Sequence, residues 1–378
     1  MFQNPLDKNI YQQRTQEKDY PIRGNYFRDQ TAIIHSMPFR RLKHKTQVFY
    51  APSNDHVCTR IEHVMHVATI AASICKGLNN SGKWELDVDM AYAIGLGHDL
   101  GHAPFGHNGE DALNDILGKN NAFVHEVNSY RVVEHLANNG KGLNLTYAVK
   151  DGILCHNGEN FEQSLSPVTT KNDLEKIKDR QCKPTSYEGC IVRFSDKIAY
   201  LGRDIEDAVI AGFISKKDIP ENIEKKIGSS NGEIIDHLVS DIILNSDNGS
   251  INFSDESFAL IKELKIFNYK NIYGNPVLND HRSYGEKIIH ALFDYLYDLI
   301  NKFGWDHKHY SDEKNISIVG AFGHYMQTMQ NFYQQEKVDY KLSDDDLNKR
   351  AITDYISGMT DLYAIECMRQ ISLPFPLF

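Results

Sequence analysis

The amino-acid sequence predicts an all-α fold, and three observations support this expectation. Apolar residues recur at helical spacing through long segments of the chain. Segments in which β-branched or aromatic residues alternate with polar ones are short and rare, so at most one hairpin is expected, near residues 47–57. Gly, Asn and Ser gather between the periodic segments, as they do in turns that connect helices.

The individual elements follow from this alternation of periodic and turn-forming segments. Residues 164–186 are polar and contain two prolines, so they are expected to form an exposed insertion. The predicted helices cover residues 61–78, 88–96, 127–137, 191–211, 234–244 and 286–303. The predicted turns cover residues 79–82, 138–142, 228–232 and 247–250.

Histidines and other chemically active residues are unevenly distributed along the chain. They concentrate in the first 210 residues, and a soft boundary is expected near residues 213–232. We therefore expect a helical core that carries the chemistry in residues 1–215. Additional helices in residues 216–378 are expected to complete the substrate pocket.

Composition excludes several classes of protein. Hydrophobic residues make up 41% and charged residues 24%, which is typical of a soluble globular domain. No segment of about 18 apolar residues is present, and the first residues do not resemble a signal peptide. The six cysteines are scattered, which favours free thiols in a reducing cytoplasm. A net charge of −10 argues against an extended basic face for nucleic acid.

The densest chemistry lies in residues 95–110, which hold three histidines, one aspartate and one glutamate. His98 and Asp99 end an apolar helix, and Gly101 and Pro104 break it. Single histidines are often core residues or helix caps. Packing so many polar groups together is costly unless they engage one another or a ligand, which favours a metal or catalytic site.

Two residues outside this segment complete a plausible metal site. His63 lies on a separate predicted helix, and Asp196 is the best candidate for a fourth ligand. Two imidazoles and two carboxylates suit Mn, Fe, Co, Ni or Zn, whereas Mg is a less natural occupant. Arg60 lies one turn before His63 and could reach a phosphate group.

Two further patterns point to proton transfer and substrate binding. His107 and Glu110 are three residues apart where a helix can start, so both lie on one face. A carboxylate that holds an imidazole sets its tautomer and suits it to acid–base catalysis. Asp196, Tyr200 and Asp204 recur every four residues, and a polar stripe of this kind indicates a lined cavity.

With these residues in place, the sequence resembles the dGTPase-like deoxynucleoside triphosphate triphosphohydrolases of the HD superfamily. The resemblance extends to the mammalian dNTP triphosphohydrolase that joins a SAM domain to an HD domain. The matching segments are residues 39–49, 59–63, 97–110, 196–208 and 354–363.

The resemblance implies roles for individual residues. His63, His98, Asp99 and Asp196 would bind one divalent transition metal, with Mg²⁺ as a further candidate that accompanies the substrate. His107 and Glu110 would form the catalytic dyad, and His125 would act as general acid on the leaving group. The implied substrate contacts are Gln47, Arg60, His102, Lys197, Tyr200, Asp204, Lys265 and Tyr273.

Other interpretations stay open for three of these residues. His125 fits an ordinary residue at a helix N-terminus, Lys265 fits an exposed lysine, and Tyr273 fits a core tyrosine. If Tyr273 is a substrate contact, the resemblance places its ring at the sugar, where it would exclude a 2′ hydroxyl.

The implied activity is hydrolysis of a dNTP, with dGTP favoured, to the deoxynucleoside and inorganic triphosphate. The implied partners are further copies of the chain and a nucleotide effector, and neither a membrane nor nucleic acid is expected. One alternative is another HD-type nucleotide phosphohydrolase, such as a monophosphatase or an alarmone hydrolase. A second is a catalytically silent HD scaffold that binds nucleotide or single-stranded nucleic acid.

Overall fold

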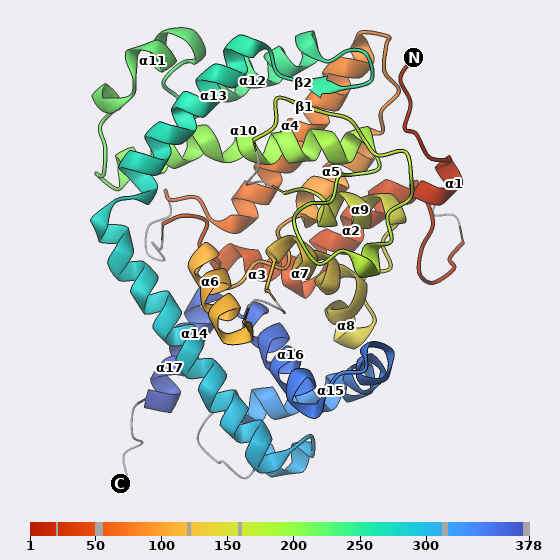
Figure 1. The fold of residues 1–378 in the computed structure, drawn as a ribbon, viewed down its shortest axis with the longest axis vertical. Coiled ribbons are helices and arrows are strands. Elements are labelled where there is room, and N and C mark those ends of the chain that lie inside the picture. Colours follow the sequence, from red (N-terminus) through yellow and green to blue (C-terminus); the bar gives the residue numbers. More distant parts are fainter. Residues whose placement is uncertain (20–21, 50–55, 119–121, 158–160, 312–316, 373–378) are drawn as a thin grey trace.

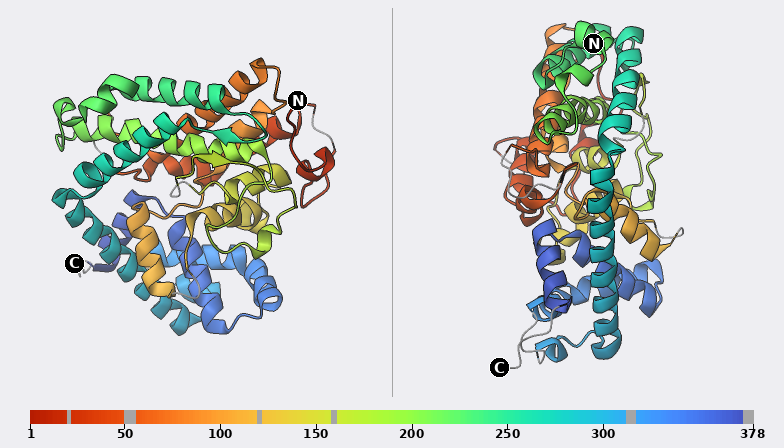
Figure 2. Two further views of the ribbon diagram at one scale, coloured as in Figure 1. Left: turned by 45° about the horizontal axis from the view of Figure 1, so that its top comes forward. Right: turned by 90° about the vertical axis from the view of Figure 1, so that its left-hand side faces the viewer.

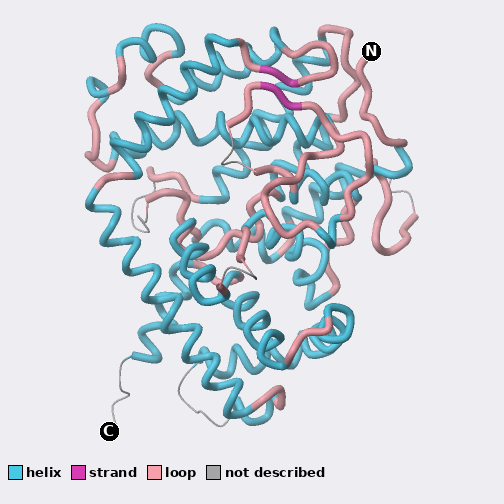
Figure 3. The backbone as a smooth tube through the Cα atoms, in the orientation of Figure 1, coloured by secondary structure: helices cyan, strands magenta, loops and turns pink. Residues whose placement is uncertain are grey.

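The computed structural model describes residues 1–378 except for 20–21, 50–55, 119–121, 158–160, 312–316 and 373–378. Helices dominate the described residues, and a single two-stranded sheet accompanies them (Figures 1 and 3). The predicted all-α class is therefore confirmed. Within the described residues, no helix is both long enough and apolar enough to cross a membrane.

The first half of the chain contributes the helices that surround the histidine-rich segment. They are α1 (Lys8–Tyr11), α2 (Asn25–Ile34), α3 (Met37–Arg41), η1 (Leu42–His44), α4 (Arg60–Asn80), α5 (Val88–Gly97), α6 (His107–Leu117), α7 (His125–Arg131), η3 (Val132–Leu136), α8 (Ala137–Gly140), α9 (Tyr147–Leu154), η4 (Leu174–Lys176) and α10 (Tyr187–Ile210).

The second half is a series of helices that covers this first part and extends beyond it. They are η5 (Lys216–Asp218), α11 (Glu221–Ile227), α12 (Asn231–Asn245), α13 (Asp255–Asn268), η6 (Tyr269–Tyr273), α14 (Pro276–Phe303), η7 (His307–Ser311), α15 (Ser317–Tyr340), α16 (Asp344–Ser357) and α17 (Asp361–Ser372).

All six predicted helices are present, and their ends follow from capping residues. In α4, Thr59 and Glu62 form a capping box, which is why this helix begins just ahead of its first apolar residue. A second capping box at Ser230 starts α12 inside the predicted turn 228–232. The scattered cysteines are all free thiols, as predicted, and five of them are buried.

The extended elements are minor. Strands β1 (Ser164–Leu165) and β2 (Ile251–Asn252) pair antiparallel, with Ser164 opposite Asn252. Near the predicted hairpin, Thr46 and Thr59 form an isolated antiparallel bridge, but residues 50–55 lie outside the described part of the chain. The predicted insertion, 164–186, is exposed or partly exposed over most of its length, but Leu165 and Leu174 are buried, as are residues 184–186 just before α10.

Two clusters of buried apolar residues hold the molecule together. The larger packs α4, α5, α9, α10 and α12 against one another. The smaller packs α6, together with Ala103 and Phe123 on either side of it, against α14, α15, α16 and α17. In Figures 1 and 2, α14 runs along one side of the molecule from the first group of helices toward the second. The boundary expected at residue 215 stays a prediction.

Buried hydrogen bonds tie the corner between α16 and α17 to two loops of the first half. One carboxylate oxygen of Asp361 accepts from the Thr46 amide at 2.8 Å, and the other accepts from the Phe105 amide at 2.9 Å. Phe105 has φ 63°, a strained left-handed conformation for a bulky residue. The Lys45 Nζ donates to the carbonyl oxygens of His102 and Ser357, at 2.5 and 2.7 Å. The C-terminal helices thus fix the backbone of both loops.

Candidate active site

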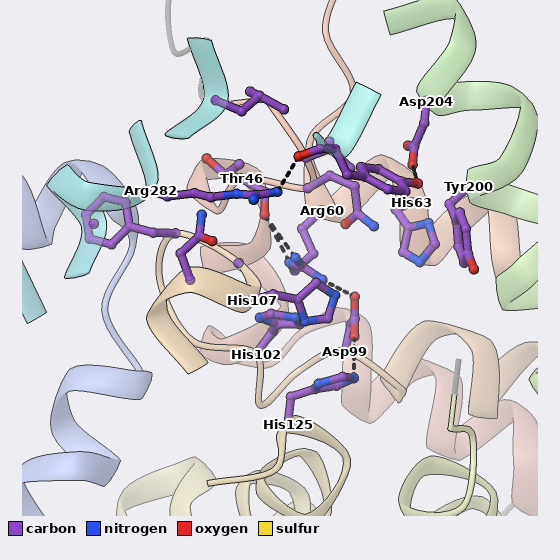
Figure 4. A pocket seen from close by; sticks show the side chains of 18 of the residues that line it. Thr46, Arg60, His63, Asp99, His102, His107, His125, Tyr200, Asp204 and Arg282 are labelled. Carbon is purple, nitrogen blue, oxygen red and sulfur yellow. Dashed lines mark hydrogen bonds and ion pairs between the residues drawn. The ribbon is translucent and has the colours of Figure 1, made fainter. Parts of the chain in front are cut away.

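A cavity of about 760 Å³ opens where α4, α6, α10 and α14 approach one another. Figure 4 shows its inner end, with side chains from several of these elements pointing toward one another. Among the predicted site residues, the lining includes Gln47, Arg60, His63, Asp99, His102, His107, His125, Asp196, Tyr200, Asp204, Lys265 and Tyr273. His98, Glu110 and Lys197 lie behind this lining.

The four predicted metal ligands come together from three parts of the chain. His63 lies on α4, His98 and Asp99 follow α5, and Asp196 lies on α10. The Nε2 of His63 is 3.0 Å from an Asp196 carboxylate oxygen, and the Nε2 of His98 is 3.7 Å from both Asp99 and Asp196.

The close approach of α4 and α5 depends on a glycine. A Cβ atom on Gly95 would lie 2.6 Å from the Ala68 Cα, which backbone atoms cannot accommodate. Glycine at this position therefore lets the helix that ends at His98 pack directly on the helix that carries His63.

The donor atoms fit a divalent ion. The His98 Nδ1–H donates to the Gly95 carbonyl at 2.8 Å, so its Nε2 carries the lone pair. This Nε2 is buried and has no hydrogen-bond partner among the described residues. An unpaired buried imidazole nitrogen facing two carboxylates is the arrangement expected of a ligand set for a transition metal.

Both carboxylates of this set are held in the ionised form. Burial alone would raise their pKa values, but Arg60 lowers the pKa of Asp99 well below its usual range. The hydrogen bond from His63 likewise lowers the pKa of Asp196. Figure 4 shows Arg60 and His125 on either side of Asp99.

The predicted pair His107–Glu110 is present, but its carboxylate has a closer partner. The Glu110 Oε2 lies 3.5 Å from the His107 Nδ1 and only 2.9 Å from the His125 Nδ1. His107 is largely exposed to solvent, whereas His125 and Glu110 are buried. The ring of His102 stacks on that of His125 at 4.6 Å. The Glu110 carboxylate thus contacts two histidines at the edge of the cavity.

The environment of His125 favours its charged form. Burial alone would lower its pKa, but Glu126 and Glu110 raise the pKa of His125 to about 9. The imidazole therefore carries a proton at neutral pH. By contrast, burial and the nearby Arg60 lower the pKa of His102, which stays neutral.

The other end of the cavity is polar and aromatic. Tyr200 and Asp204 follow Asp196 along α10, and all three line the cavity, in agreement with the stripe in the sequence. The Tyr273 hydroxyl donates to Asp204, whose pKa burial raises to about 7. The Gln47 Oε1 is buried and has no hydrogen-bond partner among the described residues, which is the condition of a group that awaits a ligand.

The two lysines among the predicted substrate contacts differ in position. Lys265 lines the cavity, with its Nζ 4.1 Å from the centre of the Phe161 ring. Lys197 is buried beside the cavity, 4.0 Å from Glu162, and burial lowers its pKa to about 8. A substrate contact for Lys197 stays a prediction.

Comparison with known proteins agrees with this geometry. Residues 60–201 match the HD domain, and residues 304–370 match the phosphohydrolase-associated domain. A deoxyguanosinetriphosphate triphosphohydrolase-like protein of Caldanaerobacter subterraneus is 36% identical, and the match spans 96% of this chain and 89% of that protein. A protein of the same description from Clostridium perfringens strain SM101 is 34% identical over 97% of this chain and 92% of its own length.

The chain belongs to the dGTPase-like family of HD phosphohydrolases. HD domains bind divalent metals, and the cluster of His63, His98 and Asp196 in this phosphohydrolase could hold such an ion.

Two residues of this HD phosphohydrolase were missed from the sequence. His156 is buried between His98 and His125, with ring centres 4.9 and 5.4 Å away. Its Nδ1–H donates to the carbonyl three residues earlier, as in His98, and both histidines follow the end of an apolar helix. This shared pattern was a usable signal. Arg180, from the predicted exposed insertion, contacts Glu110 and Glu126, and no sequence signal points to it.

Proposed function

We propose that this HD phosphohydrolase hydrolyses a dNTP, with dGTP favoured, to the deoxynucleoside and inorganic triphosphate. The observation that carries the proposal is the make-up of one cavity. Its inner end holds the His–Asp centre, and its other end holds the polar and aromatic residues that could receive a deoxyribose. The names of the similar proteins from Caldanaerobacter and Clostridium support the same activity.

The reaction would cut the bond between the α-phosphorus and the 5′ oxygen. A water molecule would add its oxygen to phosphorus, the bond to the 5′ oxygen would break, and that oxygen would take up a proton. A divalent ion held by His63, His98, Asp99 and Asp196 would stabilise the charge that develops on the α-phosphate.

The protein's own residues would move the protons. His107, backed by Glu110, is accessible from the cavity and suits the base that accepts a proton from the attacking water. His125 is charged at neutral pH and faces the same cavity, so it suits the acid that protonates the 5′ oxygen. Glu110 contacts both rings, so after each turnover it would pass the proton that His107 took from water back to His125.

Basic residues around the cavity would bind the triphosphate. Arg60, Lys265 and Arg282 line it from three different elements, and together they offer charge-assisted hydrogen bonds to several phosphate oxygens. Arg60 already holds Asp99, so it would bridge the α-phosphate and the metal centre.

Sugar recognition would fall to the opposite wall. Gln47, with its buried unpaired oxygen, would accept a hydrogen bond from the 3′ hydroxyl, and Asp204 would share that hydroxyl. The Tyr273 ring would pack against the sugar and exclude a 2′ hydroxyl. Its bond to Asp204 would hold the ring in place.

The product decides between this proposal and its alternatives. We expect phosphorus NMR of dGTP incubated with the Mn²⁺- or Mg²⁺-loaded protein to show inorganic triphosphate. Pyrophosphate and a nucleoside monophosphate would instead indicate another HD-type phosphohydrolase. Absence of turnover with all four dNTPs, supplied singly and in pairs, would favour a nucleotide-binding scaffold.

The partners expected from the resemblance also enter as proposals. We propose that the chain forms a homo-oligomer and responds to a nucleotide effector. Mass photometry with and without dGTP would test both, and a monomer unaffected by nucleotide would contradict them.

A further inference from the structure

Arg180 reaches the active-site histidines from the back of the cavity. It belongs to the segment between β1 and α10, where its neighbours Asp179 and Gln181 are exposed. Its Nε lies 3.0 Å from both carboxylate oxygens of Glu126, and its Nη2 donates to Glu110 at 2.6 Å. The guanidinium therefore joins two carboxylates that come from different helices.

Both of these carboxylates are directed at one imidazole. The His125 Nδ1 is 2.9 Å from Glu110 and 3.4 Å from Glu126, and the Arg180 Nη2 is 3.2 Å from the same nitrogen. Since Nδ1 donates to Glu110, Nη2 and Nδ1 are two donors side by side, and the planar guanidinium is held next to the imidazole by its hydrogen bonds to Glu110 and Glu126.

Two positive groups, His125 and Arg180, face the two carboxylates here. The side chains of Glu110 and Glu126 are only 5% and 0% exposed, and two buried carboxylates repel each other strongly unless they are paired. Within the described residues, Arg180 is the only arginine or lysine within ion-pair distance of either one. Without it, Glu110 and Glu126 would separate, and the imidazole would lose its fixed orientation.

We propose that Arg180 is a positioning residue: it clamps Glu110 and Glu126 against His125 so that the imidazole Nε2 faces the cavity. Arg180 does not itself line the cavity, whereas His125 does, and the His125 Nε2 lies 4.0 Å from Asp99. The effect on turnover rests on the proposed function, but the effect on the orientation of His125 does not.

Three variants test this role. Arg180→Gln removes both the positive charge and the planar set of N–H donors that reaches Glu110 and Glu126. Arg180→Lys keeps the charge but lacks that planar set of donors. Lys183→Gln removes one positive charge from an exposed position of the same segment and is the matched control. Each is compared with wild type by metal analysis, thermal unfolding and steady-state kinetics.

We expect Arg180→Gln to keep its metal and its KM for dGTP within about threefold, while kcat falls by about 10- to 100-fold, the scale of a small misplacement of a reacting group. Arg180→Lys should recover part of kcat, and Lys183→Gln should match wild type. A kcat for Arg180→Gln within twofold of wild type, or an equal loss in Lys183→Gln, overturns the proposal. If Arg180→Gln does not fold, the kcat-to-KM pattern of Arg180→Lys decides.

Crystal structures of the wild-type and Arg180→Gln proteins without substrate give an independent result. The proposal expects His125 and Glu110 to adopt different side-chain conformations in the variant. Unchanged positions overturn it even if dNTP hydrolysis is confirmed. Changed positions uphold it even if the wild-type protein proves to act on another substrate.

Discussion

Replacement of Gly101 by alanine probes how tightly the loop that follows His98 and Asp99 is packed against α7. A Cβ atom at this position would lie 2.1 Å from the Ser129 amide nitrogen and 2.3 Å from the Asn128 carbonyl carbon. Gly101 is also fixed there, because its amide donates to the Ser129 hydroxyl at 2.9 Å and its carbonyl accepts from the Asn128 side chain at 2.6 Å. Backbone lies on both sides of the contact, so no flexible side chain can move away.

The size of the effect follows from this geometry. To reach ordinary contact at 3.4 Å, the loop and α7 would have to separate by about 1.3 Å. Overpacking of this kind typically costs about 1–3 kcal/mol of unfolding free energy. Since α7 begins at His125, a displacement of about 1 Å should also lower turnover by roughly 100-fold.

The assay combines urea unfolding with dGTP turnover, and Gly320→Ala is the control. Gly320 lies within α15, and a Cβ atom there would meet nothing within 4 Å, so alanine should stabilise the protein by roughly 0.5–1 kcal/mol. If Gly101→Ala unfolds and turns over like Gly320→Ala, the inferred packing of the loop on α7 is wrong.

Three further predictions concern the metal, the sugar and pH. Asp99→Ala should lose bound metal by elemental analysis because it removes one ligand, yet it should stay folded because Arg60 keeps its hydrogen bonds to the Thr46 carbonyl. In competition kinetics, Tyr273→Ala should narrow the preference for dGTP over GTP, whereas Gln47→Ala should weaken the binding of both nucleotides alike. Burial raises the pKa of Glu188 to about 7, above its unfolded value of 4.5. The stability contributed by its neutral form is therefore fully present below about pH 4.5 and is lost as pH rises through 7, by an amount of order 3 kcal/mol. Urea midpoints should show this slope in wild type but not in Glu188→Gln.

Clear outcomes would contradict each of these expectations. Stoichiometric metal in Asp99→Ala would remove Asp99 from the ligand set. An unchanged deoxy-to-ribo ratio in folded, metal-loaded Tyr273→Ala would move the sugar gate to Tyr269, Tyr284 or Tyr200, which line the same cavity. Parallel pH profiles in wild type and Glu188→Gln would show that this carboxyl does not govern the loss of stability.

The sequence was sufficient to predict the helices, and that His98 and Asp99 lie together at the end of one of them, because both depend on local pattern. Apolar spacing placed α4 and α10, and the predicted ligands His98 and Asp99 are adjacent in the chain. Helical spacing likewise predicted that Asp196 and Asp204 share a face, and both line the cavity.

Contacts made only by tertiary packing could not be predicted in this way. Helical spacing places Glu110 next to His107, but the shorter contact, to His125, crosses between helices. Arg180 lies in a polar segment whose composition indicates exposure, and only the path of the folded chain turns this one side chain inward. Its role depends on where two carboxylates from α6 and α7 meet.

The hydrogen bonds between the C-terminal helices and the two loops at the cavity determine which residues of the cavity lining can be exchanged. Asp361 and Lys45 hold main-chain amides and carbonyls, and every amino acid except proline supplies both groups. The side chain at position 46, which lines the cavity, is therefore free to change while the frame that positions it stays the same, whereas the left-handed backbone at position 105 also restricts which residues fit there. Exchanging the side chain at position 46 would change the lining of the cavity without rebuilding the scaffold. This position is therefore the starting point for redesigning which substrates the pocket accepts.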